Sequence, residues 1–256
     1  MHIIGIDFTS RPGRRKPITA LHGRLADGVL TAQRVALWSD FAAFEAALAA
    51  PGPWVAGMDF PFGQSRRFIE TIGWPADWAA YVRYAGSLGR AGFRVALDDY
   101  RAGRAAGDKE HRRAMDQISG AISPQKLHGV PVGLMFFEGA PRLAAAGVTI
   151  PGLQAGDPAR TVFEAYPGVL ARALIGRDSY KNDDRKRQTP ALRAARQRLL
   201  AALVANCCDR HGFAVALNGG MTAAMIDDAT GDRLDALLCA VQAAWAWGQL
   251  SRRGLP

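Results

Sequence analysis

The chain contains two short apolar segments that each end in an aspartate. These segments, HIIGIDF at 2–8 and WVAGMD at 54–59, have the length and continuous apolar character of strands buried on both faces of a sheet. Between them, residues 41–50 have the composition and capping signals of a helix. Because a strand–helix–strand connection within one sheet is right-handed and parallel, we expect the two strands to be neighbours, with Asp7 and Asp59 at the same edge.

Other strands are expected on both sides of this pair. Residues 18–26 and 29–37 flank Asp27-Gly28, which is a strong signal for a two-residue hairpin turn. The first three strands are therefore predicted to be antiparallel. A further short strand is expected in TVFEAYPG at 161–168, with Glu164 near its end.

The rest of the chain is predicted to be organised around this α/β core. We expect one domain over residues 1–256, with an insertion at about 62–158 where the pattern loosens into short helices and loops. Residues 192–211 are predicted to form a helix, and residues 213–217 could form a further strand. The last helix is expected to start near Asp232.

Composition bears on location and partners. The longest apolar run, 234–250, falls short of a membrane span, the first residues show no secretion signal, and three cysteines cannot pair evenly. We therefore expect a cytoplasmic protein that does not associate with membranes. The net charge of +9 comes almost wholly from arginine, whose planar group suits phosphate, so a nucleic-acid partner is compatible with the charge.

Several motifs with well-understood chemistry are missing. The sequence has no G-x-S-x-G, no P-loop, no G-x-G-x-x-G after a strand and no H-E-x-x-H. These absences argue against lipases, P-loop enzymes, nicotinamide-dependent enzymes and zinc proteases.

Acidic residues at strand ends are the main candidates for chemistry. Asp7, Asp59 and Glu164 each follow or end an apolar strand, and ligands of open α/β sheets gather outside the carboxyl ends of the strands. Clustered carboxylates repel one another, and a divalent cation such as Mg²⁺ or Mn²⁺ relieves that repulsion.

The segment GDRLDALLCA at 231–240 adds two carboxylates at the start of the last helix. Asp232 and Asp235 are three residues apart and therefore share a helix face. They could cap the helix, because acidic side chains satisfy the free N–H groups of a first turn, or they could bind a cation. One division of roles is that Asp232 caps the helix while Asp235 faces the metal.

Four motifs carry a family resemblance that covers most of the chain. In order and spacing they resemble a domain-of-unknown-function family of predicted nucleases with the RNase H-like fold, and the last motif is similar to the closing helix of Holliday-junction resolvases. The motifs are GIDF at 5–8, GMDFPFG at 57–63, FEAYPG at 163–168 and GDRLDALLCAVQAA at 231–244.

This resemblance implies a mixed five-stranded sheet and a magnesium-dependent acidic cluster. Mapped by motif, the metal ligands and catalytic residues would be Asp7, Asp59, Glu164 and Asp235, with Asp232 as a fifth candidate ligand.

The leading functional hypothesis is an enzyme that hydrolyses phosphodiester bonds of DNA or RNA. Two ions of Mg²⁺ or Mn²⁺ would activate water and stabilise the leaving oxygen, with Asp7 as the bridging ligand. Basic side chains following the third acidic strand could position phosphates, or could simply form a solvated surface; they are Lys181, Arg185, Lys186 and Arg187.

Two alternatives belong to other functional classes. GIDFTS is similar to the first phosphate loop of sugar kinases and actin, in which Thr9 and Ser10 would contact phosphate, although such proteins need a second domain and an adenosine site. The chain could also be a noncatalytic module of the same fold that binds nucleic acid or protein.

Overall fold

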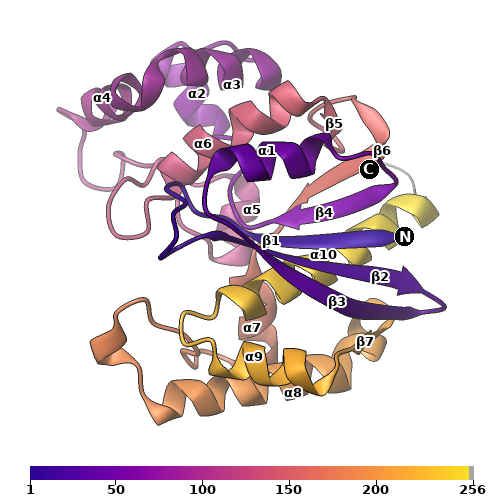
Figure 1. Ribbon diagram of the computed structural model, residues 1–256. Helices are drawn as coiled ribbons and strands as arrows, with labels where there is room; N and C mark the ends of the chain where they lie inside the picture. Colours follow the sequence, from indigo (N-terminus) through magenta and orange to yellow (C-terminus); the bar gives the residue numbers. More distant parts are fainter. Residues whose placement is uncertain (254–256) are drawn as a thin grey trace.

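The computed structural model describes residues 1–253 and, apart from Arg185 and Arg253, their side chains. A seven-stranded mixed sheet forms the centre, with strand order β5-β6-β4-β1-β2-β3-β7 (Figure 1). The strands are β1 (His2–Asp7), β2 (Ile18–Ala26), β3 (Val29–Trp38), β4 (Trp54–Met58), β5 (Val148–Thr149), β6 (Asp157–Glu164) and β7 (Ala214–Ala216).

The strand pairing predicted around β1 is confirmed. β1 is parallel to β4, with Ile6 opposite Met58, and antiparallel to β2, which is in turn antiparallel to β3. The β2–β3 turn has positive φ values of 52° at Asp27 and 73° at Gly28. Positive φ at both central residues is what a type I′ hairpin turn requires, and its twist suits the flanking strands.

The expected strand count of five is wrong, because the sheet gains two short edge strands. One is β7, which pairs with β3 and lies in residues 213–217, where the sequence suggested a further strand. The other is the two-residue β5, which pairs with β6. Strands of two or three residues are too short to show an alternating pattern in the sequence. β6 begins at Asp157, four residues before the expected strand, and ends at Glu164, which was expected near its end. Pro167 then begins the next helix.

Helices cover both faces of the sheet (Figure 1). The first group is α1 (Phe41–Ala49), α2 (Arg66–Ile72), α3 (Trp78–Ser87), α4 (Gly89–Arg101), α5 (Ala114–Ser119) and α6 (Val132–Ala146). The chain between β4 and β6, predicted to be an insertion, forms β5 and the helices α2 to α6 of this group, whereas α1 precedes β4. The second group is α7 (Pro167–Ile175), α8 (Pro190–His211), α9 (Gly219–Asp227) and α10 (Asp232–Arg253), with a 3-10 turn η1 (Arg185–Arg187) before α8.

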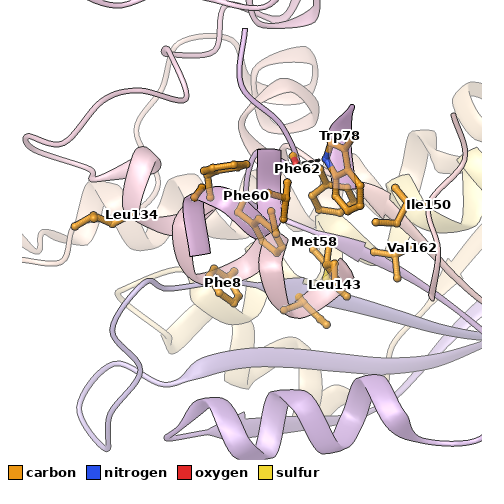
Figure 2. Packing of buried hydrophobic residues seen from close by; sticks show 14 of the residues in the cluster. Phe8, Met58, Phe60, Phe62, Trp78, Leu134, Leu143, Ile150 and Val162 are labelled. Atoms are coloured by element: carbon orange, nitrogen blue, oxygen red, sulfur yellow. Dashed lines mark hydrogen bonds between the residues drawn. The ribbon is translucent and has the colours of Figure 1, made fainter. Parts of the chain in front are cut away.

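Each face of the sheet has its own apolar core. Even-numbered residues of β1 and β4, such as Ile6 and Met58, pack with the insertion, where the indole N–H of Trp78 donates to the Phe62 carbonyl at 2.7 Å (Figure 2). Odd-numbered residues, such as Ile3 and Val55, pack against α7, α8 and α10. The alternation follows from the two-residue period of a strand. Among the described helices, none is both long and apolar enough to cross a membrane.

Candidate active site

Asp7 and Asp59 lie side by side at the carboxyl edge of the sheet. Asp7 ends β1, and the backbone N–H of Asp59 donates to the Ile6 carbonyl at 3.0 Å, which continues the β1–β4 ladder. Both are odd-numbered and therefore belong to the face that α10 covers. The predicted convergence of these two strand ends is confirmed at the level of the backbone.

Two glycines allow α10 to lie directly on this pair of strands. A Cβ atom built on Gly5 would lie 1.9 Å from the Ala236 carbonyl oxygen, and one on Gly57 would lie 2.4 Å from the Cys239 carbonyl oxygen. Each glycine precedes its aspartate by two residues, so it shares that aspartate's face. The Gly-x-Asp pattern thus supplies a flat surface for the helix and places a carboxylate at its N-terminal end.

Asp235, in the first turn of α10, is the most enclosed of the acids. Its side chain has no exposed surface. The Tyr180 hydroxyl donates to Oδ1 at 2.5 Å, and the Lys181 ammonium group donates to Oδ2. Asp235 therefore has a fixed orientation and a cationic partner 54 residues earlier in the sequence.

Burial and neighbouring carboxylates raise the pKa of Asp7 and of Asp59. Burial and then the charge of Asp235 raise the pKa of Asp7 well above its ordinary value. The same two causes raise the pKa of Asp59 to about 7. Since a charge affects a pKa strongly only at short range, the three carboxylates form one electrostatic group, called here the carboxylate cluster (Asp7, Asp59 and Asp235).

Lys181 offsets part of this negative charge. Burial acts to lower the pKa of Lys181, but the combined attraction of Asp235, Tyr180 and Asp7 raises it well above its ordinary value. The charge of Lys181 also acts to lower the pKa of Asp7 and Asp59, against the larger effects that raise both. Lys181 was predicted as a phosphate contact; in the structure its ammonium group contacts the carboxylate cluster through Asp235.

Asp232 borders the cluster, but its expected capping role falls to another residue. The carboxylate that accepts from the first turn of α10 is that of Asp228, whose Oδ2 lies 2.9 Å from the Arg233 N–H. Asp232 is 9% exposed, and its burial raises its pKa while Lys16 and Lys181 act to lower it. Asp232 is the first residue of α10, as predicted, while Asp228, four residues earlier, reaches forward and accepts from the first turn.

Glu164 lies beside Asp59 but has other partners. Its Oε2 accepts from the Phe62 N–H at 2.9 Å and from Arg113 Nη1 at 2.8 Å, and its Oε1 accepts from Arg113 Nη2 at 2.5 Å. Arg113 also binds Asp116 on α5. Glu164 thus joins β6 to the insertion, a connection that the sequence did not predict.

The other predicted phosphate contacts are spread around the cluster. Lys186 and Arg187 are exposed, and the side chain of Arg185 lies outside what the structure describes. The Thr9 hydroxyl accepts from the Arg11 N–H at 3.5 Å, and Ser10 is 6% exposed with its carbonyl bound to Arg90 at 2.9 Å.

A basic turn near the cluster was missed in the sequence. After β1, the Gly13 N–H donates to the Lys16 carbonyl at 3.1 Å, so Arg14 and Arg15 occupy the exposed tip of a tight turn. Lys16 reaches Asp183 at 2.6 Å, which ties this turn to the loop before η1. The signal was the run of basic residues that begins seven positions beyond Asp7, an acidic strand end.

A large cleft opens onto the cluster. It has a volume of about 1540 Å³ and is lined by Asp59, Glu164 and Lys181 together with residues of the insertion, α7 and α10. Tyr81, whose hydroxyl accepts from the Gln64 N–H at 3.3 Å, lies in its wall, and burial raises the pKa of Tyr81 to about 12.

The donors suit a hard divalent cation, but they are not arranged as a finished metal site. Within residues 1–253, no group of three or more histidine, cysteine, aspartate or glutamate side chains has the geometry to hold a metal ion. The carboxylate oxygens of the cluster are nevertheless the ligand type that Mg²⁺ and Mn²⁺ prefer, and their repulsion is what such an ion would relieve. A cation would have to take over the position of the Lys181 ammonium group on Asp235.

Comparison with known proteins gives one result. Searches of curated proteins and of solved structures found no significant match. A sequence model described as "protein of unknown function (DUF429)" matches residues 5–254, which is nearly the whole chain. The chain therefore belongs to the DUF429 family.

Proposed function

We propose that this protein is a metal-dependent nuclease that hydrolyses phosphodiester bonds of DNA or RNA at the carboxylate cluster. The observation that carries the proposal is the crowding of Asp7, Asp59 and Asp235, three carboxylates whose charges interact at the carboxyl edge of the sheet. Retaining such a group is unfavourable for stability alone, because each buried charge raises the free energy of the folded chain.

The topology supports an RNase H-like fold for this enzyme. Three antiparallel strands, β1 to β3, are followed by β4 and β6 running parallel to β1, as the family resemblance implies. The two additional edge strands lie outside these five. The catalytic acids of the proposal are at the centre of the five, where β1 and β4 are adjacent.

The metal would be held by the three carboxylates of the cluster, Asp7, Asp59 and Asp235. Asp232 would be a further ligand, because its charge already acts on Asp7. A bound divalent cation would act as a Lewis acid on the phosphate and promote attack by water. Glu164 would act as a positioning residue in this scheme, because Arg113 and the Phe62 N–H occupy its oxygens.

The basic residues around the cluster would orient the phosphate backbone. Lys181, once released from Asp235, could reach a phosphate in the cleft, since it already lines that cleft. Arg14, Arg15, Lys186 and Arg187 are exposed and would neutralise further phosphates. A cytoplasmic location remains part of the proposal.

Cleavage assays with a matched pair of variants test this function. Purified protein is incubated with labelled single-stranded, duplex and branched DNA and with RNA, with Mg²⁺ or Mn²⁺. We expect cleavage by wild type and by Asp40→Asn, because asparagine also caps a helix as Asp40 caps α1, and none by Asp7→Asn.

Two results would overturn the proposal. One is cleavage that survives in Asp7→Asn, and the other is the absence of cleavage on every substrate. An ATP-turnover arm in the same experiment tests the alternative phosphotransferase function, and turnover by wild type would favour that alternative.

A further inference from the structure

The cleft at the carboxylate cluster continues far beyond it, to an exposed tryptophan on α10. Gln242 and Trp245 line the same cleft as Asp59 and Lys181. Trp245 is ten residues beyond Asp235 in α10, so it is about 15 Å from it along the helix axis at 1.5 Å per residue. The cleft therefore has the length of several chain units of a polymer rather than of one small group.

The walls of this cleft are unusually apolar for a surface near a charged site. Of eleven large apolar side chains that are exposed in the described part of the chain, six line the cleft. They are Met115, Ile122, Val130, Leu153, Val169 and Trp245. Exposed apolar side chains gathered in one hollow mark a binding surface.

Trp245 has the setting of a stacking platform. It is 44% exposed, although it lies on a helix whose neighbouring residues Ala243 and Ala244 are buried. The ring of His211 meets it edge-on, with centroids 6.5 Å apart, and Arg210 lines the cleft next to His211. An exposed indole in the same cleft as a guanidinium group, whose Nη2 donates to the Ala173 carbonyl at 3.5 Å, offers a face for a base and a charge for a phosphate.

We propose that the cleft binds a single-stranded stretch of nucleic acid, with an unpaired base stacked on Trp245 and the backbone leading to the carboxylate cluster. A duplex keeps its base faces covered and presents phosphates and groove edges, so apolar walls gain little from it. An unpaired strand exposes base faces that can contact Trp245 and the apolar walls. That the bound strand is cleaved rests on the proposed nuclease function, whereas binding of the strand in the cleft does not.

Binding measured without metal tests single-strand binding separately from the nuclease activity. The probes are a labelled oligothymidylate and the same strand annealed to its complement. Binding of each probe is measured by fluorescence anisotropy in the presence of a chelator. We expect wild type to bind the single strand at least about tenfold more tightly than the duplex. Trp245→Ala should weaken single-strand binding by roughly 5- to 150-fold, whereas Trp245→Phe should keep most of the affinity.

Tyr84→Ala is the matched control, because Tyr84 is an aromatic residue with 43% exposure that does not line the cleft. It should bind like wild type. Arg210→Ala should lower the slope of log affinity against log salt by about one unit. Thermal unfolding of each variant checks that the fold is kept.

Equal affinity of Trp245→Ala and wild type for the single strand would overturn the inference, as would tighter binding of the duplex. Cleavage without this binding pattern would support the nuclease proposal and overturn the inference about single-strand binding. Single-strand binding that depends on Trp245, without cleavage in Mg²⁺ or Mn²⁺, would support the inference and overturn the nuclease.

Discussion

The ammonium group of Lys181 contacts the carboxylate of Asp235, whose side chain has no exposed surface. Asp235 also accepts the Tyr180 hydroxyl at 2.5 Å, and it interacts electrostatically with Asp7 and Asp59. The positive charge in the carboxylate cluster is thus supplied by the chain itself. A divalent cation would compete with Lys181 for Asp235.

This competition predicts that Lys181→Met binds Mn²⁺ more tightly than wild type. Removing a charged hydrogen bond that the metal must displace should raise the affinity by roughly tenfold or more, measured by isothermal titration calorimetry. Lys186→Met is the control, because Lys186 is exposed, and it should leave the affinity unchanged. Equal or weaker Mn²⁺ binding by Lys181→Met would show that Lys181 does not compete with the metal.

Gly5→Ala should weaken both the fold and the site. The added Cβ would lie 1.9 Å from the Ala236 carbonyl and 2.8 Å from the Ala240 Cβ, so α10 would have to move away from β1. We expect the free energy of unfolding to fall by about 1–3 kcal/mol or more, measured by urea unfolding, together with weaker Mn²⁺ binding. Gly13→Ala, where a Cβ meets nothing within 4 Å, should change stability little, and an equal effect of the two variants would contradict the packing argument.

Asp59 should make stability depend on pH. Its pKa is raised from 3.8 to about 7 in the folded chain, so the folded state binds the proton more tightly than the unfolded chain does. Stability contributed by this group is therefore lost as the pH rises from about 4 to about 7. Asparagine does not titrate, so Asp59→Asn does not lose this contribution. With a chelator present, the free energy of unfolding of Asp59→Asn minus that of wild type should therefore rise across this pH interval and level off above it. A difference that stays constant with pH would contradict this assignment.

Asp228→Ala should reduce stability more than Asp232→Asn does. The Asp228 carboxylate accepts from the Arg233 N–H at 2.9 Å and from the Thr230 hydroxyl at 2.6 Å. Losing a helix cap lowers the free energy of unfolding by about 1 kcal/mol, which chemical denaturation can measure. Asp40→Ala provides a second cap loss for comparison, because Asp40 Oδ1 accepts from the Ala43 N–H. A larger loss for Asp232→Asn would restore Asp232 as the cap.

The sequence predicted those parts of the site that depend on local patterns. Asp7 and Asp59 end continuous apolar strands, and the parallel pairing of those strands follows from the helix between them. Asp235 was predicted from its place in the first turn of the final helix. In each case a few neighbouring residues determine the position of the backbone.

Contacts between distant segments were not predictable in this way. Lys181 meets Asp235 across 54 residues and Arg113 meets Glu164 across 51, and a single sequence contains no signal for either pairing. The exposure of Trp245 depends on how the insertion, α7 and α8 leave one side of α10 uncovered. The short strands β5 and β7 exist only because longer strands beside them offer free backbone groups.

The close seating of α10 on Gly5 and Gly57 has a consequence for synthesis on the ribosome. Asp235 follows Asp7 by 228 residues, so at typical translation rates it emerges roughly 10–50 s later. During that interval the nascent chain carries Asp7 and Asp59 without the helix that encloses them. Completion of the carboxylate cluster is therefore tied to the docking of α10, and the site cannot be finished before this helix has been translated.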